Sequence, residues 1–282
     1  MSRKHQGDGI AMMYGFFAAE LRRRRLAAGL RLDDLGRMIN FSASLIGKIE
    51  NGDRVPTPDL AKRIDKALST GELFANLLEA IRKEARAYPS GFSDFLDEEA
   101  RATSIEEWAS LNVPGLLQTG DYARALFRGG RPSDTAEEIE QLVTTRLERQ
   151  AILAREKPPR SWFTLDEVVL RRPVGGPKVM AAQLARIVEQ AERPGIVVQI
   201  IPIAIGAHAG LLGEFRLLTR PDGSRVAYTE SIASGQLIEQ PADVAEFELA
   251  YDTLRIEALT PDASLALIRE IQGEYENEAE SH

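Results

Sequence analysis

The chain contains no cysteine, and its three histidines, His5, His208 and His282, lie far apart in the sequence. The lack of cysteine excludes disulfides, thiol catalysis and every cysteine-based zinc site, and so few histidines exclude a histidine-rich metal site. No run approaches the ~20 apolar residues of a membrane-spanning helix, and the start of the chain lacks the apolar core of a signal peptide. We therefore expect a cytoplasmic protein with no membrane partner, no metal and no other cofactor.

Basic side chains are concentrated in the first third of the chain. Residues 1–87 carry 16 Lys and Arg against 11 Asp and Glu, a balance of +5, whereas residues 88–282 carry 19 against 32, a balance of −13. A basic module attached to an acidic body suits a protein that meets DNA by one face only. Tyr88-Pro89-Ser90-Gly91 interrupts the helical pattern between the two parts. We expect a domain over residues 1–87, ordered from about residue 14, and a second domain over 88–282.

Two short amphipathic helices separated by a tight turn are predicted near the amino end. Apolar side chains recur at helical spacing on each of them: Leu32, Leu35, Met38 and Ile39, then Leu45, Ile46 and Ile49. Asn40 suits the positive φ of a helix end, and Ser42 can cap the second helix, which Asn51-Gly52 would end.

Two further helices complete this module. The first closes it over residues 58–69, and the second runs over residues 71–87. The second carries an apolar strip that a partner subunit could cover, made of Leu73, Leu77, Leu78 and Ile81.

The segment resembles the helix-turn-helix of the Xre family, also called Cro and phage-repressor-like regulators. The matching residues are Arg25, Gly29-Leu30, Leu35, Ile46, Ile49-Glu50-Asn51-Gly52 and Pro56-Thr57-Pro58. The resemblance implies a mainly α, five-helix, lambda-repressor-like domain whose second helix of the pair enters the major groove of double-stranded DNA. It also implies a partly buried ion pair between Arg25 and Glu50, which would orient the helices rather than contact DNA.

The same resemblance assigns candidate DNA contacts by position. Ala43, Ser44 and Lys48 would face the bases, while Arg31, Ser42, Asn51 and Arg54 would lie beside phosphates. The small residues Ala43, Ser44 and Gly47 stand where many relatives carry side chains able to make bidentate base contacts. Part of the discrimination could therefore come from DNA shape. Gly47 either permits close approach of the backbone to DNA or is a neutral substitution.

Beyond residue 91 the sequence predicts an α+β domain. A long helix capped by Ser133 would run to about Arg155. The other expected helices cover residues 177–191, 242–258 and 262–274, and the expected strands cover residues 162–165, 196–201, 215–219, 226–230 and 236–239. Residues 221–224 would turn a hairpin between two of these strands.

This part of the chain resembles the large domain of unknown function that follows an Xre-like module in many actinobacterial regulators, including those tied to sporulation and antibiotic production. The matching positions are Val113 to Thr119, Tyr122 to Ala125, Arg146, Arg149-Gln150, Asp166-Glu167, Leu170 to Arg172, Gly206 to Gly210, Phe215, Tyr228 and Glu230. Relatives are often encoded beside a small protein, which the resemblance makes a candidate partner.

No catalytic motif stands out in this second domain. Its carboxylates and His208 could exchange protons near neutral pH, but the chain has no nucleophile elbow, phosphate-binding Gly-Lys loop or metal-ligand spacing. We therefore expect no enzyme and no catalytic residues. A pocket or partner groove is instead expected near four residues: Arg171, Arg172, His208 and Glu230.

These features favour a sequence-specific transcriptional regulator that binds a DNA operator as a homodimer, since two-fold pairing doubles the contact of a short half-site. Its second domain would sense a small protein partner or a ligand. The alternative is an antitoxin-like protein that neutralises a small cognate partner and regulates its own operon. Co-purification with the neighbouring gene product discriminates the two.

Overall fold

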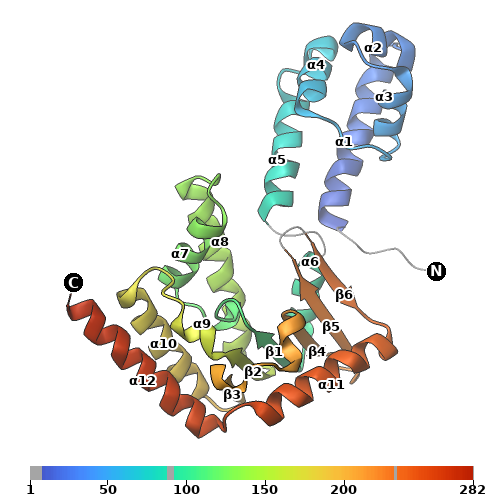
Figure 1. The fold of residues 1–282 in the computed structure, drawn as a ribbon. Helices are drawn as coiled ribbons and strands as arrows, with labels where there is room; N and C mark the ends of the chain where they lie inside the picture. The colour runs from blue at the N-terminus through green and yellow to red at the C-terminus, as the bar shows by residue number, and fades with distance from the viewer. Residues whose placement is uncertain (1–7, 88–91, 232–233, 282) are drawn as a thin grey trace. The chain divides into compact units, whose positions relative to one another are not determined.

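The structure, a computed structural model, describes residues 8–87, 92–231 and 234–281 (Figure 1). It divides into two compact units, Met1–Asp94 with Ile232–Ser234, and Phe95–Ser231 with Gly235–His282. We call them the N-terminal and the C-terminal domain. The break that the sequence predicts at residues 88–91 lies outside the described residues. No helix in the described ranges is both long and apolar enough to cross a bilayer.

The N-terminal domain is helical and is built around one apolar core. Its helices up to residue 87 are α1 (Asp8–Ala27), α2 (Leu32–Ile39), α3 (Ala43–Glu50), α4 (Pro58–Leu68) and α5 (Leu73–Ala87). Each contributes to the core, whose buried members are Phe17, Leu21, Leu35, Ile39, Ile46, Ile49, Leu60, Ala61, Ile64, Phe74, Leu78 and Ile81. The predicted mainly α, five-helix domain is thereby confirmed.

The prediction that Met38 lies on the apolar face of α2 is wrong, whereas the prediction that the apolar strip on α5 is suited to packing is confirmed. Met38 is 55% exposed, because it lies off the face of α2 that directs Leu35 and Ile39 inward. On α5, Leu78 and Ile81 are buried in the domain's own core, and the other two members of the predicted strip pack against it. That strip is therefore not free to meet a partner subunit.

A buried carboxylate joins α4 to α5. Asp65, which is 4% exposed, accepts hydrogen bonds from the backbone N–H groups of Phe74 (2.9 Å) and Ala75 (2.8 Å) at the start of α5. The Thr70 hydroxyl donates a third, at 2.5 Å. The first turn of a helix has N–H groups without helical partners, and Asp65 satisfies two of them from a neighbouring helix.

The C-terminal domain is built on a six-stranded mixed sheet of order β3-β2-β1-β4-β5-β6. The strands are β1 (Ser104–Ala109), β2 (Arg160–Asp166), β3 (Ile196–Ile201), β4 (Phe215–Thr219), β5 (Arg225–Glu230) and β6 (Gly235–Ile238). β1 to β3 are parallel, and β4 to β6 continue the sheet antiparallel. The α+β class is thereby confirmed.

Helices surround this sheet. They are α6 (Phe92–Arg101), α7 (Gly120–Gly130), α8 (Ala136–Arg149), α9 (Glu167–Arg171), α10 (Pro177–Ala191), α11 (Pro241–Glu257) and α12 (Pro261–Glu280). α10 and α12 pack side by side (Figure 1). α11 buries Val244, Tyr251 and Leu254 against sheet residues that include Trp108 and Phe215.

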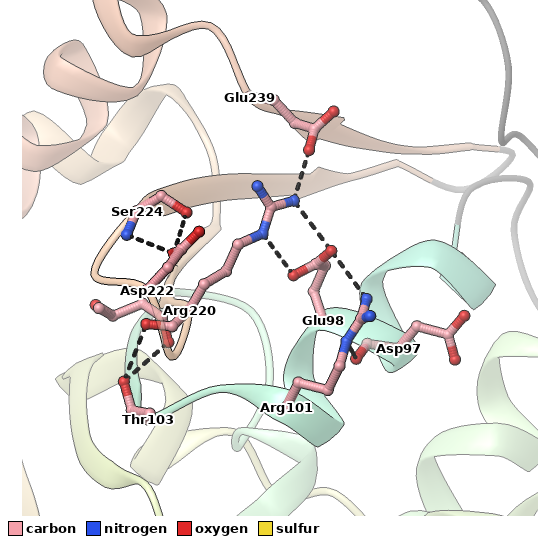
Figure 2. Close-up of polar contacts among 9 residues, drawn as sticks. Asp97, Glu98, Arg101, Thr103, Arg220, Asp222, Ser224 and Glu239 are labelled. Carbon is pink, nitrogen blue, oxygen red and sulfur yellow. Dashed lines mark hydrogen bonds and ion pairs between the residues drawn. The ribbon is translucent and has the colours of Figure 1, made fainter.

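An arginine fastens α6 to the sheet. The Arg220 guanidinium donates to both carboxylate oxygens of Glu98 in α6, at 2.8 and 3.0 Å, and to Glu239 at 2.5 Å (Figure 2). These contacts lower the pKa of the Glu98 carboxyl, chiefly through the hydrogen bond from Arg220. Phe95 of the same helix stacks on Tyr228 of β5, with ring centroids 4.3 Å apart. α6 is thus held by charge at one end and by aromatic packing nearer its start.

The elements predicted from the sequence are largely those observed in this domain. β3, β4 and α10 have the predicted bounds. The predicted cap at Ser133 is wrong, because Thr135 caps α8 and the Glu138 carboxylate accepts a hydrogen bond from the Thr135 N–H at 2.8 Å. α8 also ends at Arg149 and continues only as a 3-10 segment to Ala154. The sequence did not predict α6, β1 or α7.

Replacing Asp65 with alanine is expected to destabilise the α4–α5 junction by about 2–3 kcal/mol, because two backbone N–H groups lose their acceptor in or near the core. Hydrogen exchange at Phe74 and Ala75 in the full chain measures this as faster local opening. Asp59→Ala is the control, since Asp59 is exposed and pairs only with the half-exposed Arg63 at 2.9 Å. Equal exchange in the two variants would contradict the assigned role of Asp65.

Candidate nucleic-acid interface

The turn between α2 and α3 is held by two backbone features. Asn40 adopts a left-handed conformation with φ of 60°, as predicted, and ends α2. Gly36 lies where the chain passes back over α2, and a Cβ there would stand 2.7 Å from the carbonyl oxygen of Phe41. A side chain at position 36 would therefore push the turn away from α2. These two residues fix how α3 leaves α2.

α3 begins and ends as its sequence predicts. The Ser42 hydroxyl oxygen accepts a hydrogen bond from the Leu45 N–H at 3.2 Å and so caps the helix. Ile46 and Ile49 are buried in the domain core, which fixes the rotation of the helix about its axis. Gly52 follows the helix with φ of 80°.

The opposite face of α3 is open to solvent. Ser44 and Lys48, four residues apart, are exposed, while Ala43 and Gly47 are half-buried. A Cβ at Gly47 would lie 3.5 Å from Leu32 Cδ1, an ordinary packing distance, so the fold does not itself require glycine there. The candidate base-facing residues thus share one accessible surface, which is the condition for their proposed role.

The candidate phosphate-side residues surround that face. Arg31 begins α2, Ser42 and Asn51 flank α3, Arg54 follows it, and all four are exposed. Among the described residues, neither Arg31, Lys48 nor Arg54 takes part in an ion pair, so their charges are available to an anion.

Other arginines of the domain are neutralised by carboxylates. Arg23 and Arg24 both donate to Glu20, which lowers the pKa of that carboxyl to about 2. Arg37 pairs with Asp34 at 2.5 Å. Three of the four arginines in the basic run at the end of α1 are therefore paired with carboxylates, whereas Arg31, Lys48 and Arg54 around α3 are not in an ion pair among the described residues.

A buried ion pair ties α1 to the end of α3. Arg25 Nε donates to Glu50 Oε1 at 2.6 Å and Nη2 donates to Oε2 at 2.8 Å. The Arg25 and Glu50 side chains are only 9% and 5% exposed. Arg25 Nη1 also donates to the carbonyl oxygen of Leu30 at 2.8 Å, and the bond to Glu50 raises the pKa of the guanidinium. The predicted pair is confirmed, and the bidentate geometry fixes the direction of α3.

Three of the four candidate ligand residues of the C-terminal domain, His208, Arg171 and Glu230, have structural partners. His208, whose side chain is 3% exposed, accepts the Gly210 N–H at Nδ1 (3.2 Å) and places Nε2 3.5 Å from an Asp166 carboxylate oxygen. Its ring meets the Trp108 ring edge-on at 5.2 Å. This arrangement shapes the loop between β3 and β4, and it leaves little of the imidazole for a ligand.

The other three candidates contact residues different from those around His208, or are exposed. Arg171 pairs with Glu167 at 2.6 Å and Glu274 at 3.2 Å, so it joins α9 to α12. Arg172 is exposed. Glu230 lies at the end of β5, where Tyr228 donates to it at 3.3 Å.

Several residues on which the resemblance of this domain rests hold the loop around Gly115 and Gln118 in place. Arg146 Nη1 donates to the Gln118 side-chain oxygen at 2.8 Å. Gln150 Nε2 donates to the carbonyl oxygens of Gly115 (3.0 Å) and Gln118 (2.8 Å). A Cβ on Gly115 would approach Arg149 Nη2 to 2.8 Å, so the two arginines of α8 need glycine there. These positions are explained by the fold.

A set of buried charges was not predicted from the sequence. Glu99 of α6 and Glu107 of β1 are 1% and 2% exposed, and Arg149 and Arg216 bind them at 3.0 and 2.8 Å, respectively. Oε1 of Glu99 accepts no hydrogen bond among the described residues. Burial raises the pKa of the Glu99 carboxyl, because desolvation outweighs the attraction of Arg149.

Comparison with known proteins agrees with this architecture. Residues 17–81 match a family described as a helix-turn-helix domain, and residues 92–270 match the family described as a domain of unknown function (DUF5753). The fold and the first match indicate a DNA-binding regulator. The second match spans more than half of the chain, which therefore belongs to the DUF5753 family, as its sequence predicts. No curated protein and no solved structure matches the chain.

Breaking the Arg25–Glu50 pair from one side is expected to cost about 3 kcal/mol of stability, because a buried charge loses its partner. Glu50→Ala should therefore unfold the N-terminal domain at a lower urea concentration than the wild type. The double variant Arg25→Met/Glu50→Leu removes both charges and should recover much of the loss. Chemical denaturation followed by circular dichroism measures both. A double variant no more stable than Glu50→Ala would contradict the account.

The raised pKa of Glu99 predicts a pH-dependent difference between the wild type and Glu99→Gln. The folded protein holds a proton that the unfolded chain releases near pH 4.5, so this contribution to stability is full below pH 4.5 and is lost as pH rises through the folded pKa. Because glutamine stays neutral, the variant should gain stability relative to the wild type as the pH rises above 4.5. Urea unfolding at several pH values tests this. A constant difference would contradict it.

Proposed function

We propose that the protein is a sequence-specific transcriptional regulator that binds its DNA operator as a homodimer, with α3 in the major groove. The observation that carries this proposal is the exposed face of α3, which combines Ser44 and Lys48 while Ile46 and Ile49 anchor the opposite face. A helix held in this way can enter the groove without disturbing the core.

The side chains on and around α3 also support its placement in the major groove. Lys48 can donate to guanine acceptors, the methyl group of Ala43 can contact a thymine methyl, and Arg31 and Arg54 can neutralise phosphates. Because Ala43, Ser44 and Gly47 are short, only a few bases would be read directly. The remaining selectivity would come from DNA shape, which the flanking phosphate contacts sense.

A homodimer is proposed because one α3 covers only a short half-site, and two-fold pairing doubles the contact. The C-terminal domain, acidic over residues 88–282 with 19 basic and 32 acidic side chains, would be repelled by the phosphate backbone and would stay clear of it. We propose that this domain receives a partner, either a small protein or a ligand, that alters the affinity for DNA.

Alanine at Lys48 and Ser44 is expected to reduce the preference for the operator over unrelated DNA by about 1–3 kcal/mol, because base contacts carry sequence information. Arg54→Ala is the matched control. It should weaken binding to both DNAs alike and reduce the slope of log K against log salt by about 1. Fluorescence anisotropy with an operator selected from random duplexes measures both. An unchanged operator preference in the Lys48/Ser44 variant would refute the assignment of α3.

A further inference from the structure

α11 is apolar on two opposite faces, of which only one is covered. Its inner face buries Val244, Tyr251 and Leu254 in the core of the C-terminal domain. On its outer face Leu249 is 66% exposed and Ile256 is 84% exposed. A surface helix normally carries apolar side chains on the face toward the core and polar side chains on the opposite face. The large apolar side chains on the outer face of α11 therefore indicate a contact surface.

The outer residues follow the spacing of a coiled-coil seam. Ala242, Ala245, Leu249, Asp252 and Ile256 are exposed and recur at steps of three and four residues. We call this set the outer seam. Such 3-4 spacing aligns apolar side chains along one line, where a second helix can insert its own side chains between them. The seam spans about four turns, or roughly 21 Å, which suits a partner helix of similar length.

A rigid apolar turn lies against the same helix. The 3-10 turn Ala209–Leu212 packs on α11, and Leu211 and Leu212 are 60% and 100% exposed. Trp108 Nε1 donates to the Gly210 carbonyl at 2.9 Å, and a Cβ on Gly210 would collide with the Trp108 ring. The two leucines are therefore held in solvent by a fixed backbone.

The charges of α11 select the kind of partner. The helix contains five carboxylates and one guanidinium, and Glu246 and Asp252 are exposed beside or within the outer seam. Glu248 pairs with Arg225 at 3.0 Å, and the exposed Asp252 lies 3.8 Å from Arg255 of the same helix. Pairing with α11 of a second copy would bring the exposed carboxylates together, which is unfavourable for like charges at a helix interface. A helix with lysine or arginine beside its apolar stripe would pair with them instead.

We propose that the outer seam of α11 is a docking surface for an amphipathic α-helix of a different protein, one with an apolar stripe at heptad spacing and basic flanking residues. This rests on the proposed function, in which the C-terminal domain receives a partner, and it specifies the partner as a basic helix rather than a small ligand. Asp252, within the seam, sets the register by pairing with a basic side chain.

A synthetic peptide of two heptads, the length of the outer seam, serves as the probe, with leucine at the seam positions and lysine beside them, so that its own charges oppose self-association. A matched peptide carries glutamate in place of lysine. Fluorescence anisotropy with the full chain should show the basic peptide binding about tenfold tighter than the acidic one. Leu249→Gln/Ile256→Gln should lose about tenfold in affinity for the basic peptide. Leu147→Gln is the control, since Leu147 is 40% exposed on α8.

Equal binding of the two peptides, or unchanged binding by the Leu249/Ile256 variant, would overturn the proposal. So would sedimentation showing that the wild type self-associates and that this variant does not, because the occupant would then be a second copy. DNA binding of the same variant is measured separately and is expected to be unchanged. A wild type that prefers no DNA sequence would refute the regulator proposal while leaving the peptide result intact.

Discussion

The geometry of the N-terminal domain depends on the ion pair between Arg25 and Glu50. It joins the end of α1 to the end of α3 with two hydrogen bonds of 2.6 and 2.8 Å, and the same guanidinium holds the Leu30 carbonyl before α2 begins. Because both side chains are buried, the pair contributes direction more than net stability. This pair, together with Ile46 and Ile49, prevents α3 from rotating about its axis. The same side chains of α3 therefore stay exposed to solvent.

Local sequence signals predicted the parts of the fold that local chemistry determines. The Ser42 cap and Asn40 in its left-handed conformation defined α3 and the turn before it. The partner of Arg25 lies 25 residues away, and only the family resemblance could assign it. β1 escaped prediction because two adjacent glutamates interrupt its apolar pattern. Glu107 is buried there only because Arg216 stands opposite it on β4.

The candidate sites also divide into features that the local sequence determines and features that depend on distant residues. The candidate DNA contacts on α3 were assigned by the family resemblance, and helical spacing explains why Ser44 and Lys48 face solvent while Ile46 and Ile49 face the core. The role of His208 could not be predicted from local spacing, because it depends on Trp108 and Asp166, which come from other strands. α11 carried a signal that sequence reasoning did not use: apolar residues on both faces, with acidic residues between them.

The central claim, that α3 lies against base edges, can be tested directly by disulfide cross-linking, because the chain has no cysteine of its own. Cysteine would be placed at Ser44 in one protein and at the exposed Lys66 of α4 in another, each mixed with operator duplexes that carry a thiol tether on one base in the major groove. The account predicts efficient cross-linking from position 44 at one or two bases per half-site and little from position 66. Equal cross-linking from both positions, or none from position 44, would contradict it.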